Sequence, residues 1–142
     1  DFASSFAIGK ARRYKEGSDI TLIATGGILD DVNIAAVELE KLGIDVRVLG
    51  MHSIKPIDID EIIDAATNTG GIVTIEEHNK DGGLGSAVSE VCMDFGVMPK
   101  EFLRIGLENM YSSIVGSQQY LRSRYRMDSV AIIDRVKEIL KT

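Results

Sequence analysis

Two neighbouring stretches contain polar residues that could bind a ligand or take part in acid–base catalysis. The first is a polar group, Glu76, Glu77, His78 and Asn79, which directly follows an apolar run. A histidine beside carboxylates can act as a general base or contact a substrate, and open α/β sheets usually place functional groups at the carboxyl ends of their strands. The second is the loop Asp-Gly-Gly-Leu-Gly-Ser-Ala at residues 81–87. It leads from a predicted strand into a predicted helix, where free backbone N–H groups and the helix dipole favour an anion.

Together these stretches define a candidate anion or interface site. Its members are Glu77, His78, Asn79, Gly82, Gly83, Gly85 and Ser86. The loop is not a P-loop, because it lacks the Gly-Lys-Ser/Thr ending, and its spacing does not match Gly-x-Gly-x-x-Gly. A tight turn with close helix packing therefore explains the glycines more simply than a bound anion does. For residues 76–79 we favour a structural or interface role, and only some of them can share a site because adjacent strand residues point to opposite faces.

Other reactive residue types do not assemble into a catalytic or metal site. The single cysteine, Cys92, excludes an internal disulfide and falls on the apolar face of a predicted helix, where a buried, inert thiol is expected. The two histidines are far apart, so this chain alone cannot form a Cys/His metal cage, and His52 is interpreted as a loop histidine. No Ser-His-Asp or Cys-His arrangement can be assembled. We therefore assign no catalytic, cofactor-binding or metal-binding residue.

A basic run with interleaved tyrosines lies near the C-terminus. It contains Arg122, Arg124 and Arg126, with Tyr120 and Tyr125 between and beside them. Basic residues alternating with aromatic ones can bind RNA. The whole chain, however, has 16 Lys and Arg against 22 Asp and Glu, a net charge of −6, which argues against nucleic acid or an anionic membrane as the main partner. A solvated face or a contact with a protein partner is the preferred interpretation.

Composition and hydropathy predict one globular domain over residues 1–142, located in the cytoplasm. The 142 residues are 44% hydrophobic, with no internal repeat and no linker-like tract. No apolar run approaches the ~20 residues that cross a bilayer, and residues 1–5 show no signal pattern. Because the chain does not begin with Met, we expect that it was cut from something longer.

Short apolar runs alternate with segments of helical spacing along the chain. The apolar runs predict strands at residues 20–24, 46–49, 71–75 and 102–105. Helices are predicted between Asp30 and Gly43, over residues 59–66 after a cap at Asp58 or its neighbour, over residues 84–95, and from about residue 128. Their inward-facing stripes are expected to include Leu42, Phe95 and Val130. Residues 76–85 are predicted to form a loop.

This alternation predicts the fold class. Strands and helices at this spacing imply parallel strands joined by right-handed crossovers, with helices on both faces of the sheet. Residues 6–14 mix apolar and basic side chains, which suits a charged edge strand, placed as antiparallel. The sequence thus predicts an α/β protein with three layers, α/β/α, around a mixed, mostly parallel five-stranded sheet whose first strand is an antiparallel edge strand.

Four motifs, in order along the chain, carry a resemblance to a known family. They are Ile-Gly-Lys-Ala at residues 8–11 with the stretch 16–26, Ile-Lys-Pro-Ile-Asp at 54–58, Val-Thr-Ile-Glu-Glu-His-Asn at 73–79, and Gly-Gly-Leu-Gly-Ser-Ala-Val at 82–88. In this order and spacing they resemble the C-terminal domain of transketolase and of its relatives, the deoxyxylulose-phosphate synthases and the β subunits of 2-oxoacid dehydrogenases. The resemblance implies a mixed five-stranded sheet between helices with an antiparallel first strand.

The resemblance also implies what this chain does not carry. Enzymes of the family bind thiamine diphosphate and Mg²⁺ between two preceding domains, through a Gly-Asp-Gly…Asn motif and a catalytic glutamate, and the chain contains no Gly-Asp-Gly. No family catalytic or cofactor residue maps onto it, so no cofactor is expected on this chain. The implied role is a non-catalytic C-terminal domain or subunit of a transketolase-like enzyme of the pentose phosphate pathway, which moves a two-carbon ketol unit between sugar phosphates. The domain would serve assembly and homodimer packing, with the catalytic domains or subunit of the same enzyme as partners.

Other interpretations stay open at this point. The whole enzyme could be a deoxyxylulose-phosphate synthase or a 2-oxoacid dehydrogenase β subunit, or the chain could be a regulatory module that binds phosphate at the loop of residues 82–86. The match to the family also weakens after Gly106, where relatives have Gly-Val-Pro-Asp and later Tyr-Gly. This chain has Tyr125-Arg126 instead of Tyr-Gly, so Arg126 must adopt a costly left-handed conformation or the helix must end differently.

Overall fold

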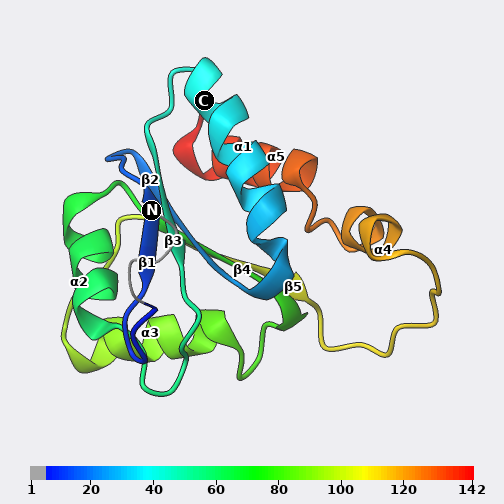
Figure 1. Cartoon of the computed structure of the whole chain (residues 1–142). Helices are drawn as coiled ribbons and strands as arrows, with labels where there is room; N and C mark the ends of the chain where they lie inside the picture. Colours follow the sequence, from blue (N-terminus) through cyan, green and yellow to red (C-terminus); the bar gives the residue numbers. More distant parts are fainter. Residues whose placement is uncertain (1–5) are drawn as a thin grey trace.

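A five-stranded sheet forms the centre of the computed structural model, which describes residues 6–142 (Figure 1). Across the sheet the strands follow the order β1-β3-β2-β4-β5. Their bounds are β1 Arg12–Lys15, β2 Ile20–Thr25, β3 Val46–Gly50, β4 Ile72–Asn79 and β5 Phe102–Leu107. The helices are a short 3-10 turn, η1 Gly26–Ile28, followed by α1 Leu29–Lys41, α2 Ile59–Asn68, α3 Leu84–Asp94, α4 Gln118–Arg124 and α5 Ser129–Leu140.

The sheet is mostly parallel, with one antiparallel edge. β2 pairs in parallel with both β3 and β4, and β4 pairs in parallel with β5. β1 pairs antiparallel with β3. The first five residues of β2 are buried, and so are the first five residues of β4. This burial is expected for strands that helices cover on both faces. The predicted α/β class, mixed five-stranded sheet and antiparallel first strand are confirmed.

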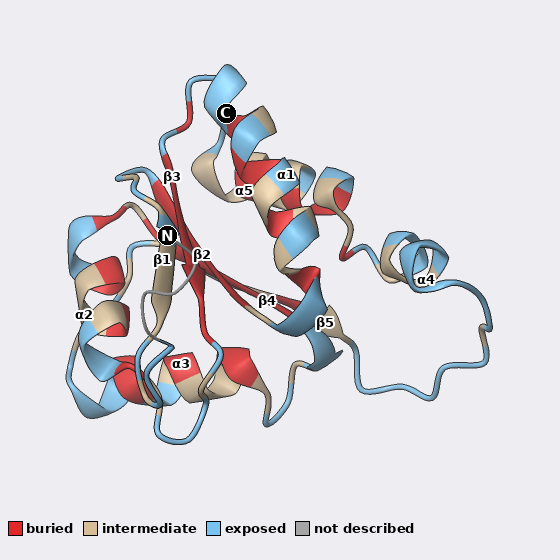
Figure 2. Cartoon of the chain, viewed as in Figure 1, coloured by how far each residue is buried: buried red, intermediate tan, exposed pale blue. Residues whose placement is uncertain are grey.

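Helices on the two faces of the sheet enclose two apolar clusters (Figures 1 and 2). On one face α1 and α5 pack against each other, and Ile132 of α5 is fully buried there. On the other face α2 packs against α3, and Ile62 of α2 is fully buried. Because successive strand residues point to opposite faces, Leu22 of β2 enters the first cluster and Ile23 enters the second. The sheet therefore divides the core into two layers.

Two strands differ in length from the prediction. β4 continues through Asn79, because Asn79 still pairs with Leu107 of β5, so residues 76–79 belong to a strand and not to the predicted loop. The edge strand is shorter than the predicted residues 6–14, because only Arg12–Lys15 pairs with β3. The longer β4 carries the polar group of residues 76–79 past the apolar core.

Helix ends also depart from the prediction. Asp58 caps α2 as predicted, with its side chain accepting from the Glu61 N–H. Asp30 does not cap α1, because α1 continues directly from η1 and Asp30 already lies in its first turn. The predicted inward-facing residues Leu42, Phe95 and Val130 are exposed, because each lies at a helix terminus. The hydropathy pattern did not predict α4 at all.

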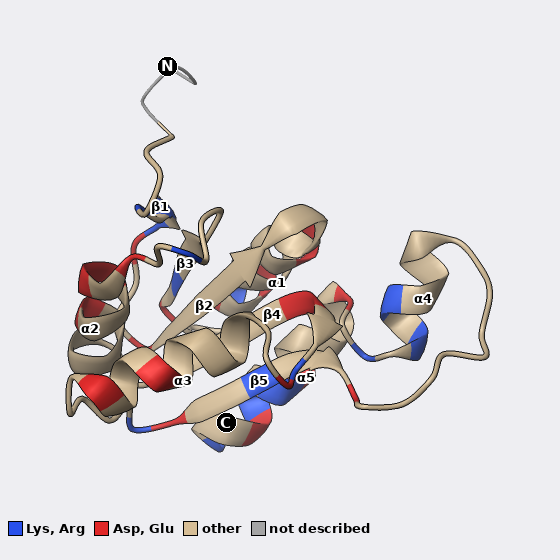
Figure 3. Cartoon of the chain, turned by 90° about the horizontal axis from the view of Figure 1, so that it is seen from below, with Lys and Arg blue, Asp and Glu red and all other residues tan. Residues whose placement is uncertain are grey.

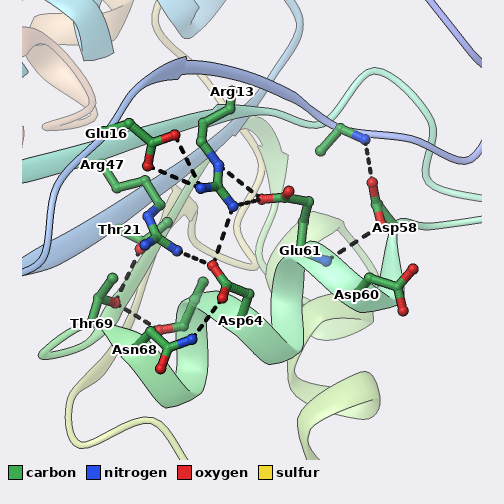
Figure 4. A network of polar contacts seen from close by, with 12 residues as sticks. Arg13, Glu16, Thr21, Arg47, Asp58, Asp60, Glu61, Asp64, Asn68 and Thr69 are labelled. Atoms are coloured by element: carbon green, nitrogen blue, oxygen red, sulfur yellow. Dashed lines mark hydrogen bonds and ion pairs between the residues drawn. The ribbon is translucent and has the colours of Figure 1, made fainter.

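A polar network ties the edge strand to α2 (Figure 4). Arg13 of β1 pairs with Glu61 at 2.7 Å and with Asp64 at 3.2 Å. Arg47 of β3 is buried, and its guanidinium also pairs with Asp64. Asn68 donates to Asp64 at 2.6 Å. One carboxylate thus joins two strands to one helix, and this contact holds the short edge strand in place.

Substitution of Asp64 tests this network. The hydrogen bond from Asn68 lowers the pKa of Asp64, and Arg47 and Arg13 lower it further. A carboxyl whose pKa is lower in the folded chain stabilises the fold above about pH 4 and loses that effect as the pH falls. We expect Asp64→Asn to lower the free energy of unfolding by about 2 kcal/mol at neutral pH, and the difference to shrink in acid. Urea denaturation measures it, with the exposed Asp60→Asn as the control. Equal stability of the two variants at neutral pH would contradict the prediction.

Candidate functional site

The end of β4 and the start of α3 meet around a buried carboxylate. Glu76, a residue of β4, is only 1% exposed. Its Oε1 accepts the Leu84 N–H at 2.9 Å and its Oε2 accepts the Gly85 N–H at 2.8 Å. The first N–H groups of a helix have no partner within the helix and attract negative charge. The N-terminus of α3 therefore already holds an anion, and the chain itself supplies it.

The glycines of the loop have steric reasons to be glycine. A Cβ at position 83 would overlap Glu76 Oε1 and would lie 2.7 Å from the Asn79 carbonyl oxygen. A Cβ at position 85 would lie 2.7 Å from both Arg104 Cδ and Thr74 Oγ1. Close approach of this kind is what the missing side chain of glycine permits. Both glycines let α3 sit against the end of the sheet, where Glu76 reaches its backbone.

Ser86 closes the same loop from the other side. Its hydroxyl accepts the Gly82 N–H at 3.0 Å and donates to the Lys80 carbonyl, also at 3.0 Å. The Arg104 guanidinium of β5 donates to that carbonyl at 3.0 Å and to the Ser86 hydroxyl at 3.3 Å. The loop is thus held by hydrogen bonds from α3 and from β5. Arg104 was not among the candidates from the sequence, because nothing in its spacing pointed to the loop.

Glu77 lies on the opposite face of the sheet from the loop. The Arg122 guanidinium of α4 donates to both of its oxygens, at 2.7 and 3.0 Å, and Gln118 also donates to it. Arg122 reaches Asp31 of α1 as well, at 2.9 Å. The hydrogen bond from Arg122 lowers the pKa of Glu77. Strand alternation thus separates Glu77 from the glycines, and the predicted group of seven residues divides into two places.

His78 and Asn79 lie with the loop, at the exposed end of β4. His78 is 66% exposed, and its Nδ1 lies 3.8 Å from Glu76 Oε1 and 2.9 Å from the Asn79 carbonyl oxygen. The other predicted histidine, His52, lies in a different loop with its Nε2 3.1 Å from the Ala7 carbonyl oxygen. Cys92 is buried in α3, and burial raises the pKa of its thiol. The described residues bring no base, nucleophile and acid together.

The family resemblance implies Mg²⁺ and thiamine diphosphate in the whole enzyme, which raises the question of a metal site in the described residues. Within residues 6–142, no group of three or more His, Cys, Asp or Glu side chains is arranged to hold a metal ion. No step of a reaction is assigned to thiamine diphosphate or Mg²⁺ on these residues. None of the described helices is long and apolar enough to cross a membrane.

Residues 108–126, here called the arm, extend away from the body of the domain (Figures 1 and 2). The arm includes α4, which has no buried residue. Tyr111 is fully exposed and Val115 is 93% exposed. Beneath α4, a hollow of about 440 Å³ is lined mainly by apolar groups, including Leu121 and Met127. The ion pairs of Arg122 and the packing of Tyr125 against the core link the arm to the body, while Tyr111 and Val115 have little contact with the rest of residues 6–142.

Comparison with known proteins places these features in a family. The model of the family "Transketolase, C-terminal domain" matches residues 9–132. The chain is 37% identical over 136 residues to an apulose-4-phosphate transketolase subunit of Phocaeicola vulgatus, covering 96% of this chain and 42% of that subunit. It is 34% identical over 134 residues to 6-deoxy-6-sulfo-D-fructose transketolase subunit SqwH of Clostridium sp. (strain MSTE9), covering 94% of this chain and 41% of that subunit.

Two further similarities extend the comparison. The chain is 35% identical over 140 residues to 1-deoxy-D-xylulose-5-phosphate synthase of Syntrophotalea carbinolica, covering 99% of this chain and 22% of the synthase. Among solved structures, a split-gene transketolase in an inactive beta4 tetramer superposes with a TM-score of 0.86 at 34% identity, covering 96% of this chain and 44% of that one. The chain thus spans less than half the length of each of these proteins.

Substitution of Glu76 tests the internal anion at α3. Glu76→Gln keeps the shape but turns an amide group with donor hydrogens toward backbone N–H donors, so we expect it to lower the free energy of unfolding by about 2 kcal/mol. Gly83→Ala should destabilise the fold at least as much, because its Cβ would overlap the same carboxylate. Urea denaturation measures both, with Glu90→Gln on the exposed face of α3 as the control. Stability of Glu76→Gln equal to that of the control would contradict this account.

The pair of Glu77 and Arg122 predicts a pH response of the arm. Because the pKa of Glu77 is lowered in the folded chain, the pair stabilises the arm above about pH 4 and is lost as the pH falls. We expect Glu77→Gln to speed amide hydrogen exchange across α4 at neutral pH, and to remove the acid-induced loosening that the unmodified chain shows. Glu138→Gln on α5 is the control. An arm that exchanges identically in the unmodified chain and in Glu77→Gln would refute the role of this pair.

Proposed function

The chain belongs to the transketolase C-terminal domain family, and on that basis we propose that it is the non-catalytic C-terminal domain, or a part of one subunit, of a transketolase-like enzyme. The whole enzyme transfers a two-carbon ketol unit between sugar phosphates. Thiamine diphosphate and Mg²⁺ are held by its other parts, which correspond to the length of the relatives that this chain does not span. The relatives are named for different sugars. The proposal therefore specifies the class of reaction, and identifying the pathway requires measuring which sugar is the substrate.

The arm is the observation that carries an assembly role. Tyr111 and Val115 are almost entirely exposed, and the apolar hollow under α4 is open. Exposed apolar groups of this kind mark interaction surfaces, and tyrosine is enriched in interfaces. The ion pairs of Arg122 fix α4 to Glu77 of β4 and to Asp31 of α1, while Tyr111 and Val115 stay exposed. The occupant we propose is the catalytic part of the same enzyme, whose two copies form a homodimer in the cytoplasm.

A 1-deoxy-D-xylulose-5-phosphate synthase is the second candidate for the whole enzyme. The identity to the S. carbinolica synthase, 35% over 99% of this chain, favours it as strongly as the transketolase subunits favour the first. The residues at the end of β4 support both, because the sequence motifs there are shared in the family resemblance. Two hybrids separate them: the chain replaces the matching part of the transketolase subunit in one and of the S. carbinolica synthase in the other, and the hybrid that assembles and stays active identifies the enzyme.

A hybrid subunit tests the assembly role. Residues 1–142 replace the matching 136 residues of the P. vulgatus transketolase subunit, and the hybrid is purified with the remaining subunit of that enzyme. We expect assembly and transketolase activity to be retained. The double substitution Tyr111→Asp and Val115→Asp should weaken assembly by at least about tenfold, because it places charges in an apolar contact.

The matched control for that experiment is Met98→Asp, which changes an exposed apolar residue outside the arm. Sedimentation velocity measures assembly, and circular dichroism checks that each hybrid is folded. A folded hybrid that does not assemble would overturn the proposal. So would an assembly that tolerates the double substitution in the arm as well as it tolerates the control.

A further inference from the structure

A small basic pocket lies on the edge of the sheet next to β5. Its volume is about 240 Å³, and it is bounded by β5, by the residue that follows β4, and by the C-terminal end of α4 and one side of α5. Figure 3 shows basic segments of β5 and α5 near one another, with further basic residues on α4. Five cationic side chains line the pocket: Lys80, Arg104, Arg124, Arg126 and Arg135.

The positive charge of the pocket is not balanced by its own acids. Glu108 is the one carboxylate among the lining residues, and Lys80 pairs with it. Arg104 donates to the neutral oxygens of the Lys80 carbonyl and the Ser86 hydroxyl. Arg135 lies 3.7 Å from the carboxylate of Glu138, which is outside the pocket and beyond hydrogen-bond length. Within residues 6–142, no ion pair joins Arg124 or Arg126 to an acid.

This excess of positive charge runs against the composition of the chain. The sequence as a whole is acidic, with a net charge of −6, yet four arginines and one lysine line a single hollow. Like charges gathered in this way repel one another unless an anion joins them. A guanidinium matches phosphate and carboxylate oxygens with a rigid fork of N–H donors. The pocket is therefore complementary to a ligand that carries more than one negative charge.

The backbone conformation of Arg126 is a second observation that supports a role for this pocket. Arg126 follows α4 in the left-handed conformation, with φ of 55°, where glycine fits without strain and a larger residue costs about 1 kcal/mol. This is the position at which the family resemblance has glycine. The chain thus carries a strained arginine where an unstrained residue would end the helix, and this arginine lines the pocket.

The size of the pocket limits the class of ligand. A volume of about 240 Å³ falls below the ~300–1,000 Å³ of pockets that hold drug-sized molecules. Ile105, Met110 and Tyr125 provide walls without charge. We propose that this pocket binds a small multivalent phosphate, either pyrophosphate or a sugar bisphosphate. Arg124, Tyr125 and Arg126 belong to the arm, but the proposal rests on the charge and shape of the pocket and uses no step of the assembly argument.

An NMR titration of the full chain tests the pocket at low ionic strength, where the attraction between charges is least screened. The probes are pyrophosphate, fructose bisphosphate and inorganic phosphate. We expect the first two to shift the amide signals of residues 104–106 and 124–126, and to bind more tightly than inorganic phosphate. Tighter binding of fructose bisphosphate than of pyrophosphate assigns the site to a sugar phosphate, and the reverse order assigns it to pyrophosphate.

Two variants make the result decisive. Arg126→Gly removes one guanidinium and also relieves the left-handed backbone, so it should weaken binding about tenfold or more without loss of thermal stability. Arg124→Gln should weaken binding similarly, while Lys100→Gln, which removes an exposed charge outside the pocket, should not. Absence of localised shifts with pyrophosphate and with the bisphosphate would overturn the proposal. Equal weakening by Lys100→Gln, or unchanged binding by Arg126→Gly, would overturn it as well.

Discussion

Glu76 carries a charge at the end of a central strand, almost entirely out of contact with solvent. A buried carboxylate is costly unless donors surround it, and here the first N–H groups of α3 are those donors. This contact fixes the first turn of α3 at the end of the sheet. It also requires glycine at position 83, where a Cβ would overlap the carboxylate. The glycine-rich loop is therefore explained by an anion that belongs to the chain.

Because β4 is pleated, the next residue, Glu77, lies on the opposite face of the sheet from Glu76. There Arg122 joins Glu77 to α4 and to Asp31 of α1. Two adjacent glutamates of the same chemical type thus hold two different elements, a buried helix start and an exposed arm. The arm leaves Tyr111 and Val115 exposed, a surface that suits the larger assembly of which family members form a part. Within the basic run, Arg122 forms ion pairs inside the domain, whereas Arg124 and Arg126 line the pocket proposed to bind phosphate.

Charge is distributed unevenly over the domain, and this unevenness decides where an anion could bind. The overall charge of −6 disfavours nucleic acid as a partner. The N-terminus of α3, which the motif had suggested for an anion, is filled by Glu76. The arginines that line the basic pocket lie instead next to β5, and one of them, Arg104, also donates to Ser86 of the loop. Local geometry therefore outweighs both the net charge and the motif.

Apolar periodicity and short motifs are local properties of the chain, so the fold class, the antiparallel first strand and the family could be predicted from the sequence. The sequence also indicated that Arg126 must adopt a left-handed conformation or end the helix differently, and the structure shows the left-handed conformation. Contacts between residues far apart in the chain became visible only in the folded structure. Glu77 and Arg122 are 45 positions apart in the chain, and Arg104 and Arg135 come from a strand and a helix separated by the whole arm. Pairings over such distances depend on how the sheet, the helices and the arm pack, and no local pattern encodes them.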